Sequence, residues 1–260
     1  MLASGCFSKP DFTGMRDGGP DDARDDAEID GPPVGPCAWM DFADQLRVYL
    51  PLDEGTGTNA DDRSPDDLDG TLTGATFTGA GRIGGAASFA ELTDARIDLG
   101  SSSLLDNMTA VSACAWVFLD TLPVDLASTI VDKSSNGFVG GWNMYFEKAP
   151  ARRVGFLTSF GDYVSGSKDY TTGQWMHLCA TWDGTVGPQG IKLYRDGEVD
   201  AQDRIVAGDG MRDDDGPEPL VLGRASNSNV YNLNGKIDEF FLFERVLSLG
   251  EVASLHACAP

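Results

Sequence analysis

The chain has 260 residues, of which 41% are apolar, and its formal net charge is −22 at pH 7. This charge argues against a nucleic-acid partner, because phosphates require a surface rich in Lys and Arg, and it equally disfavours an anionic membrane surface. The apolar content is enough for the core of one large domain, and no stretch reaches the roughly 18 to 20 consecutive apolar residues of a membrane-spanning helix.

The first six residues, MLASGC, have the pattern found at the end of a bacterial lipoprotein signal. In such a signal small residues precede a Cys that is lipidated and becomes the new N-terminus. The basic and long apolar regions of a signal are missing, and Ala3 stands where the pattern usually has Leu. We expect residues 1–6 to be the remnant of such a signal, with Cys6 lipidated; the alternative is an ordinary cysteine near a terminus. The first interpretation predicts an exported protein: an outer membrane lipoprotein, at the cell surface or periplasmic.

Residues 7–36 are rich in Asp, Gly and Pro and have no apolar period. Such a segment has too little to bury, so it is predicted to be a disordered acidic linker. Within it, residues 28–30 (EID) resemble the start of the catalytic Glu-x-Asp-x-x-Glu strand of jelly-roll glucanases. The third carboxylate is absent and Pro32 cannot continue a central strand, so we expect no catalytic strand here.

From Leu46 onward, short segments rich in β-branched and aromatic residues alternate with Gly, Asp or Asn. The Asp-Gly pairs at 183–184 and 196–197 predict tight hairpin turns, because both residue types tolerate positive φ. No long helical period interrupts these segments, which favours an antiparallel sandwich over an α/β fold. The predicted strands are 46–52, 71–78, 86–90, 96–99, 109–119, 129–133, 142–147, 153–160, 163–167, 174–182, 191–195, 219–222 and 236–243.

One short helix is predicted near the C-terminus. Ser248 and Glu251 have the spacing of a capping box, in which each side chain accepts a hydrogen bond from the backbone of the other. Val252 and Leu255 follow on one face, so the helix should pack on the sandwich through that face.

Six short motifs occur in a fixed order between residue 46 and the C-terminus. They are VYLPLDEGTG (48–57), DGTL (69–72), GGAASF (84–89), VSACAWV (111–117), WMHLCATWDG (175–184) and GKIDEF (235–240). In this order they resemble the motifs of laminin-G-like jelly-roll domains, which are part of the concanavalin A-like lectin and glucanase superfamily. Each motif is weak alone, but the ordered set is specific. The resemblance implies an all-β, antiparallel jelly-roll β-sandwich over residues 37–260.

Four cysteines remain when Cys6 is set aside for lipid: Cys37, Cys114, Cys179 and Cys258. An even number in an exported protein suggests two bridges with three possible pairings, and the alternative is buried free thiols. Cys114 and Cys179 lie in the middle of predicted strands, an arrangement similar to the single bridge of pentraxins, which share the sandwich. This resemblance implies a Cys114–Cys179 disulfide. Because the termini of such sandwiches usually lie close together, Cys37 and Cys258 are expected to form the second bridge.

The same resemblance implies a structural calcium ion. Jelly-roll binding domains commonly hold Ca²⁺ between the loop after the first strand and the last strand, and Ca²⁺ prefers six to eight oxygen ligands. The expected ligands are Asp53, Asp62, Asp66 and Asp238. Pro65 and Asp66 replace the Gly-Asn pair of the family pattern, which changes the loop. In the alternative interpretation the loop is a solvated turn and Asp238 makes a structural hydrogen bond.

Carbohydrate contact is the most familiar role of this family and uses aromatic rings that stack on sugar faces. Trp142, Tyr163 and Tyr231 lie in or near predicted loops and strand ends, and we expect them to contact the ligand. Core packing is the alternative for each of them.

Nucleophile and base pairs typical of enzymes are missing from the sequence. There are two histidines, and His177 stands in a strand where the family also has His, which is more often a satisfied, partly buried residue than a base. The sequence therefore predicts a non-catalytic exported binding module, with carbohydrate as its ligand and calcium as a structural ion. The alternative is an adhesion or scaffold domain that binds surface proteins. A glycan-acting enzyme is the least favoured, because it would need two carboxylates facing each other across the concave sheet.

Overall fold

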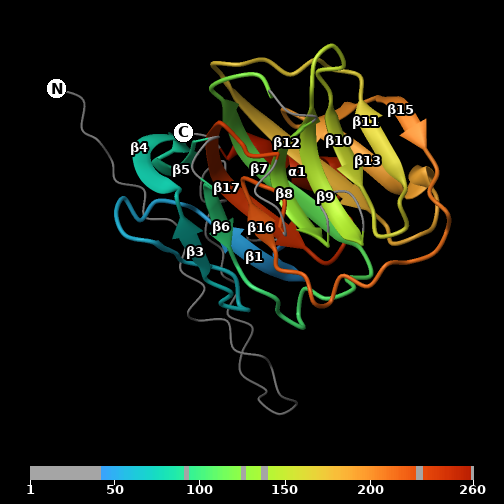
Figure 1. Cartoon of the computed structure of the whole chain (residues 1–260), viewed down its shortest axis with the longest axis horizontal. Coiled ribbons are helices and arrows are strands. Elements are labelled where there is room, and N and C mark those ends of the chain that lie inside the picture. The colour runs from blue at the N-terminus through green and yellow to red at the C-terminus, as the bar shows by residue number, and fades with distance from the viewer. Residues whose placement is uncertain (1–41, 91–93, 124–126, 136–139, 227–230, 259–260) are drawn as a thin grey trace, which may run out of the picture.

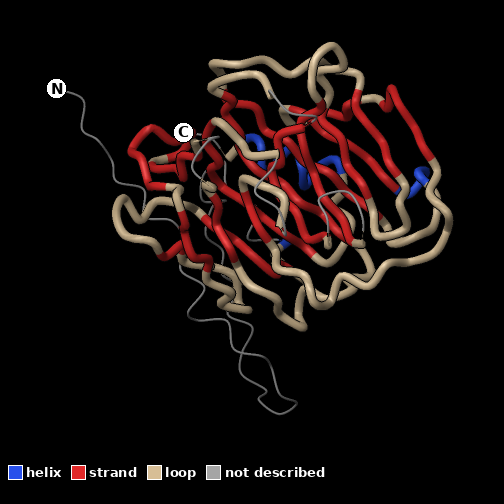
Figure 2. Tube along the Cα trace, in the orientation of Figure 1, coloured by secondary structure: helices blue, strands red, loops and turns tan. Residues whose placement is uncertain are grey.

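The structure is a computed structural model in which the described residues form two antiparallel sheets packed face to face and one α-helix on the outside (Figure 1, Figure 2). This confirms the predicted all-β sandwich with a short C-terminal helix. The predicted signal remnant and linker lie outside the described residues, as do Cys6 and Cys37. The structure describes residues 42–90, 94–123, 127–135, 140–226 and 231–258.

Sheet A contains the first and the last strand of the described chain. The first strand, β1, pairs with the last strand, β17, alongside residues 240–243, and β5 pairs with the other half of β17. The order across sheet A is β14 (Glu198–Asp200), β13 (Ile191–Arg195), β12 (Trp175–Trp182), β7 (Val111–Leu119), β17 (Gly235–Phe243), β5 (Gly85–Phe89) and β4 (Thr76–Ile83), with β1 (Leu46–Leu50) also on β17.

Sheet B packs against sheet A and begins at an edge strand that follows β14 directly in the chain. The chain therefore crosses from one sheet to the other at Ala201. The order across sheet B is β15 (Gln202–Val206), β11 (Tyr163–Gly166), β10 (Val154–Leu157), β9 (Gly141–Glu147), β8 (Ala127–Ser134), β16 (Val221–Leu222), β6 (Arg96–Asp98), β3 (Gly70–Thr73) and β2 (Asn59–Ala60).

The core lies between the two sheets and is filled by alternate residues of each strand. In β7, Ala113, Ala115 and Val117 face the core, and in β9 Trp142 and Met144 do so. The residues between them point to the outer face of each sheet, because successive side chains of a strand alternate. Each sheet therefore has one core face and one outer face.

Helix α1 (Leu249–Ala257) covers part of the outer face of sheet A. Ser248 Oγ accepts a hydrogen bond from the Glu251 N–H and the Glu251 carboxylate accepts one from the Ser248 N–H, so the predicted capping box is confirmed. Val252 and Leu255 pack in one buried cluster with the outer-face aromatic residues of β1 and β17.

The Cys114–Cys179 disulfide lies in the same cluster, between facing residues of β7 and β12 whose Cα atoms are 4.1 Å apart. The prediction that these two cysteines pair is confirmed. Cys258 is also disulfide-bonded, and its partner lies outside the described residues, so the pairing of Cys258 with Cys37 stays a prediction.

Apart from the exact strand ends, three segments differ from the strands predicted from the sequence; one is the two-residue strand β2 (Asn59–Ala60), which was not predicted. The predicted strand 71–78 is two strands, β3 and β4, in different sheets, because Gly74 adopts a φ of 65° and breaks the extended chain. Residues 198–206 were not predicted to be strands and form β14 and β15, short edge strands with few apolar residues. The turn before them was predicted: Asp196 and Gly197 have φ of 54° and 79°.

No helix within the described ranges is long and apolar enough to cross a membrane.

Candidate ligand-binding face

The outer face of sheet B collects aromatic and polar side chains from neighbouring strands. Asn143, Tyr145 and Glu147 of β9 point outward, because the residues between them face the core. The register places Leu157 of β10 opposite Asn143, and on its other side Leu157 pairs with Tyr163 of β11. Residues from three strands therefore lie side by side on this face.

Tyr145 and Tyr163 form the centre of the face. Their rings are stacked, with centroids 6.1 Å apart and an interplanar angle of 18°. Gly155 of β10 pairs with Tyr145 on one side and with Ser165 on the other, and a Cβ there would lie 2.8 Å from Tyr163 Cε2 and 3.2 Å from Tyr145 Cζ. The absence of a side chain at Gly155 therefore lets the two rings converge. We call these two residues the tyrosine pair.

Glu147 and Arg204 flank the tyrosine pair on one side. The Tyr163 hydroxyl donates to Glu147 Oε1 at 2.5 Å, and Arg204 Nη1 lies 3.6 Å from the same oxygen. The Arg204 guanidinium also lies over the Tyr163 ring, 5.3 Å from its centroid, and its side chain is 65% exposed. Burial, followed by the hydrogen bond to Glu147, raises the pKa of Tyr163, so its phenol stays protonated. The face thus offers an exposed cation beside a carboxylate.

Asp132 lies on the same face in β8, next to Asn143. It is fully buried, and its two oxygens accept hydrogen bonds from Ser134 Oγ and the Ser226 N–H, each at 2.6 Å. Burial raises the pKa of Asp132 to about 6, and these hydrogen bonds partly oppose the rise. Its role is to hold the segment after β16 against the sheet.

Asp132 and Glu147 do not have the geometry of a glycosidase pair. Glu147 lies four residues beyond Asn143 along β9, which at roughly 3.3 Å per residue is about 13 Å. Catalytic carboxylates of glycosidases are roughly 5 to 9.5 Å apart. Asp132 is moreover buried beneath Ser226 and has no contact with solvent.

A pocket of about 220 Å³ lies at the end of this face, where β10 turns into β11. Leu157 lines the pocket and also packs beside the tyrosine pair, so the pocket continues the outer face. We call it the end pocket. It is lined by Gly140, Leu157, Thr158, Phe160, Gly161, Asp209 and Asp213.

Asp162 fixes the wall of the end pocket. Its buried carboxylate accepts hydrogen bonds from the Gly187 N–H at 2.7 Å and the Gly208 N–H at 2.9 Å. A Cβ at Gly208 would lie 1.9 Å from the Phe160 carbonyl oxygen, so only glycine allows the loop to approach this closely. The loop that carries Asp209 and Asp213 is therefore tied to the β10–β11 turn.

The three aromatic residues predicted to contact ligand lie in different environments. The prediction for Trp142 is wrong: its side chain is fully buried in the core, 6.2 Å from the Phe156 ring. Because side chains alternate along a strand, Trp142 and Tyr145 point to opposite faces of β9, and Trp142 points into the core. Tyr163 does lie on the outer face but is only 6% exposed, and Tyr231 is half-buried beside it.

Two of the expected calcium ligands meet at the β4–β5 hairpin. Asp238 Oδ2 accepts hydrogen bonds from the N–H groups of Arg82 and Ile83, both at 2.8 Å. Asp53 Oδ1 accepts one from the Gly85 N–H at 2.5 Å. The first-strand loop and the last strand are therefore brought to one corner, as the resemblance implied.

The other two expected ligands are engaged elsewhere. Asp62 accepts four hydrogen bonds within its own loop and from β1, and Asp66 forms an ion pair with Arg47 at 3.1 Å. The four carboxylates thus do not fit one calcium ion. Across the described ranges, no group of three or more His, Cys, Asp or Glu side chains could hold a metal. Calcium binding at the Asp53–Asp238 corner stays a prediction.

The two histidines lie on the outer face of sheet A, near helix α1. His177 is 1% exposed, and its ring lies 5.3 Å from Trp116 and 5.7 Å from His256. Burial, followed by the charge of His256, lowers the pKa of His177 to about 3. His177 is therefore a neutral packing residue at physiological pH.

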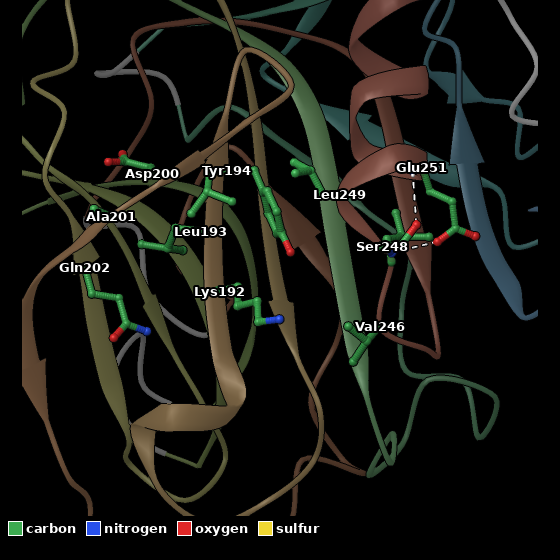
Figure 3. A pocket seen from close by; sticks show the side chains of 12 residues that line it. Lys192, Leu193, Tyr194, Asp200, Ala201, Gln202, Val246, Ser248, Leu249 and Glu251 are labelled. Atoms are coloured by element: carbon green, nitrogen blue, oxygen red, sulfur yellow. Dashed lines mark hydrogen bonds between the residues drawn. The ribbon is translucent and has the colours of Figure 1, made fainter.

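A groove of about 720 Å³ runs beside the start of α1, on the outer face of sheet A. Figure 3 shows Lys192 and Tyr194 of β13 on one side of it and Val246, Leu249 and Glu251 on the other. Three of its apolar side chains are exposed: Val199 by 52%, Val246 by 37% and Leu249 by 49%. We call this the α1 groove.

The end pocket is not predictable from the sequence, because its lining comes from three separate loops. Phe160, Asp209 and Asp213 meet only through hydrogen bonds between segments far apart in the chain. The available signal was the Gly and Asp content of residues 207–213, which marks a loop but not a pocket.

Comparison with known proteins assigns the family. Residues 91–253, more than half of the chain, match the laminin G model described as the concanavalin A-like lectin/glucanases superfamily. The chain belongs to this superfamily. No curated protein sequence matches it.

Solved structures share the sandwich at low sequence identity. Domain 4 of AbnA, an extracellular arabinanase from Geobacillus stearothermophilus in complex with arabinotriose, is 19% identical with a TM-score of 0.58, and the match covers 82% of this chain and 98% of that one. The receptor-binding domain of botulinum neurotoxin mosaic serotype C/D is 17% identical with a TM-score of 0.61, covering 82% and 50%. A Trypanosoma rangeli sialidase is 14% identical with a TM-score of 0.56, covering 82% and 32%. At these identities the likeness shows the fold, and the chain spans half or less of the toxin domain and of the sialidase.

Proposed function

We propose that this chain is a non-catalytic carbohydrate-binding module that holds its ligand on the outer face of sheet B. The observation that carries the proposal is the placement of the tyrosine pair, the exposed Arg204 and the end pocket on one continuous face. Sugar ligands need apolar surface for the ring faces and paired donors and acceptors for the hydroxyls. Leu157 at the end pocket supplies apolar surface, Arg204 and Glu147 supply a donor and an acceptor, and the tyrosine pair, whose two residues are 8% and 6% exposed, holds these two in place.

Arg204 and Glu147 would recognise adjacent hydroxyl groups of a sugar. The guanidinium donates in a fixed fork, and the carboxylate accepts, so the two can bind one diol from both sides. The stacked tyrosines fix this pair, because Tyr163 holds Glu147 through its hydroxyl and Arg204 through its ring. The arabinotriose bound to the AbnA domain supports a glycan as the ligand.

The positions of the two carboxylates on the outer face of sheet B support binding without catalysis. Asp132 is buried and fully engaged, and Glu147 is about 13 Å further along the neighbouring strand. A glycosidase needs both groups in contact with the same glycosidic bond.

The test is glycan binding by variants of the outer face. Wild-type protein is screened on a glycan array and its best ligand is titrated by calorimetry. Arg204→Ala removes an exposed side chain and should weaken binding roughly tenfold without lowering the melting temperature. Trp175→Ala is the matched control, because Trp175 packs on Phe118 at the outer face of sheet A. Absence of any glycan ligand for the folded wild-type protein would refute the proposal.

A protein-binding role is the second candidate, and the α1 groove is the observation that favours it. Its exposed Val199, Val246 and Leu249 form an apolar lining such as protein contacts bury. Leu249→Asp should then abolish adhesion to a protein-coated surface while Arg204→Ala leaves it intact. If instead Arg204→Ala abolishes adhesion and Leu249→Asp leaves it intact, adhesion belongs to the outer face of sheet B.

We further propose that the module is exported and anchored through Cys6. The MLASGC pattern and the disulfides support this, because disulfides persist in oxidising compartments. Cys6→Ala should move the protein from the membrane fraction to the soluble fraction of the cells that produce it. Unchanged fractionation would contradict the anchor.

A further inference from the structure

We infer that the end pocket holds one ring of an uncharged or amino sugar and rejects acidic sugars. This inference rests on the proposed carbohydrate-binding function and adds the class of ligand. It is carried by the volume of the pocket, by its mixed lining and by the charge of its two carboxylates.

The volume limits the ligand to a single ring-sized group. At about 220 Å³ the end pocket is below the roughly 300 to 1,000 Å³ of sites that enclose drug-sized molecules. Because Leu157 belongs both to the pocket and to the cluster around the tyrosine pair, the rest of a glycan chain would continue along the outer face of sheet B.

The lining matches the two kinds of surface that a sugar ring presents. Leu157 supplies apolar side-chain surface for the C–H groups of a ring face, and Phe160 lines the pocket beside it. Phe160 is held in place because Trp182 contacts it edge-on at 5.8 Å and Arg212 lies 5.9 Å from its centroid. This part of the pocket wall is therefore ordered before a ligand binds, which lowers the entropic cost of binding.

Two carboxylates supply acceptors for sugar hydroxyls. Asp213 Oδ2 accepts the Gly140 N–H at 3.1 Å, and Asp209 Oδ1 accepts the Met211 N–H at 2.9 Å. Each bond uses one oxygen and orients the carboxylate, which leaves its second oxygen to accept a hydroxyl. Carboxylates accept and do not donate when ionised, so they select groups that donate: hydroxyl, amine or N–H.

The same charges exclude acidic sugars. A uronate or sialate in the end pocket would place a third negative charge beside Asp209 and Asp213, while the nearby Arg212 guanidinium lies over the Trp182 and Phe160 rings and donates to the Met108 carbonyl at 2.8 Å. The net charge of −22 adds a long-range repulsion of anionic glycans at low ionic strength. An amino sugar would gain from the same field.

The experiment titrates the full chain with three methyl glycosides of equal size: a neutral hexose, the corresponding amino sugar and the corresponding uronic acid. We expect the amino sugar to bind at least as tightly as the neutral sugar, and the uronic acid to bind roughly tenfold or more weakly than the neutral one. In Asp209→Asn/Asp213→Asn, the preference for amino over uronic sugar should shrink by about tenfold or more. Asp120→Asn, which removes a carboxylate paired with Lys236 on sheet A, is the control and should change nothing.

The outcomes separate the two proposals. If a glycan binds the wild-type protein and Arg204→Ala weakens it, but the double Asn variant keeps the wild-type preference, the end pocket is not the sugar subsite and this inference fails alone. Equal binding of the uronic acid and the neutral sugar would overturn it as well. If no glycan on the array and none of the three glycosides binds, the proposed function itself fails.

Discussion

Two buried ionisable residues have shifted pKa values: His177 on the outer face of sheet A and Asp132 on the outer face of sheet B. The two shifts change the stability with pH in opposite directions. Burial of His177 lowers its pKa from 6.5 to about 3, and burial of Asp132 raises its pKa from 3.8 to about 6. In both cases burial disfavours the charged form. At the residue scale, these two groups therefore contribute pH dependences of opposite sign to the stability.

His177 should destabilise the protein in acid. The unfolded chain binds a proton at this residue below pH 6.5 and the folded chain does so only near pH 3, so stability falls as the pH drops between these values. The loss from this group is about 2 kcal/mol at pH 5. His177→Phe should remove this part of the pH dependence, measured by urea unfolding from pH 7 to pH 4. An unchanged slope in the variant would contradict the assignment.

Asp132 should act in the opposite direction over an overlapping range. Its folded pKa lies above the unfolded value, so the folded chain binds the proton first and stability falls as the pH rises from about 4 to 6. Asp132→Asn keeps an oxygen to accept the Ser226 N–H and removes the charge. The substitution should raise the free energy of unfolding at pH 7 by up to about 3 kcal/mol. It should also make the decrease in stability that His177 causes at acidic pH steeper, because the opposing contribution of Asp132 is gone. The same unfolding series measures both effects. A variant that is less stable than the wild type at pH 7 would contradict the predicted role of Asp132.

At the scale of elements, local signals were predictable and the choice of face was not. The Asp196-Gly197 turn and the capping box at Ser248 depend on adjacent residues, so the sequence contains them in full. Alternation places Trp142 and Tyr145 on opposite faces, but which face becomes the core depends on the second sheet. The end pocket requires three loops that are held together by hydrogen bonds to Asp162 and Asp213, and no local pattern encodes those contacts.

The β7–β12 pair carries the disulfide that closes a sequence separation of 65 residues. Loop entropy assigns such a bridge roughly 4 kcal/mol, because it restricts the unfolded chain. Replacing both Cys114 and Cys179 by Ala should lower the free energy of unfolding by this order. Denaturant unfolding of the double variant measures it, with Ser248→Ala, expected to cost about 1 kcal/mol through loss of the helix cap, as a smaller reference change. A loss no larger than that of the cap variant would show that the bridge contributes little.

At the scale of the whole molecule, the first loop and the last strand meet at the corner of Asp53 and Asp238. If Ca²⁺ binds the folded protein there, Ca²⁺ at 100 times its dissociation constant stabilises the fold by about 2.7 kcal/mol. Asp238→Asn should remove most of this gain, because the amide lacks the charge. Asp66→Asn should retain it, since Asp66 pairs with Arg47. Melting with EDTA and with Ca²⁺ tests all three proteins; equal wild-type melting temperatures would exclude the site.

Both ends of the described chain leave the sandwich on the same side. Phe42 packs against the cluster that contains helix α1, and the helix ends at Ala257, so both ends lie over sheet A. Sheet B turns its outer face the opposite way (Figure 1). A partner joined directly at residue 42 or at residue 258 therefore lies on the side of sheet A, away from the outer face of sheet B. If the outer face of sheet B binds glycan as proposed, several copies attached to one surface through these ends would present that face in parallel, and the array would gain avidity without any change to the individual site.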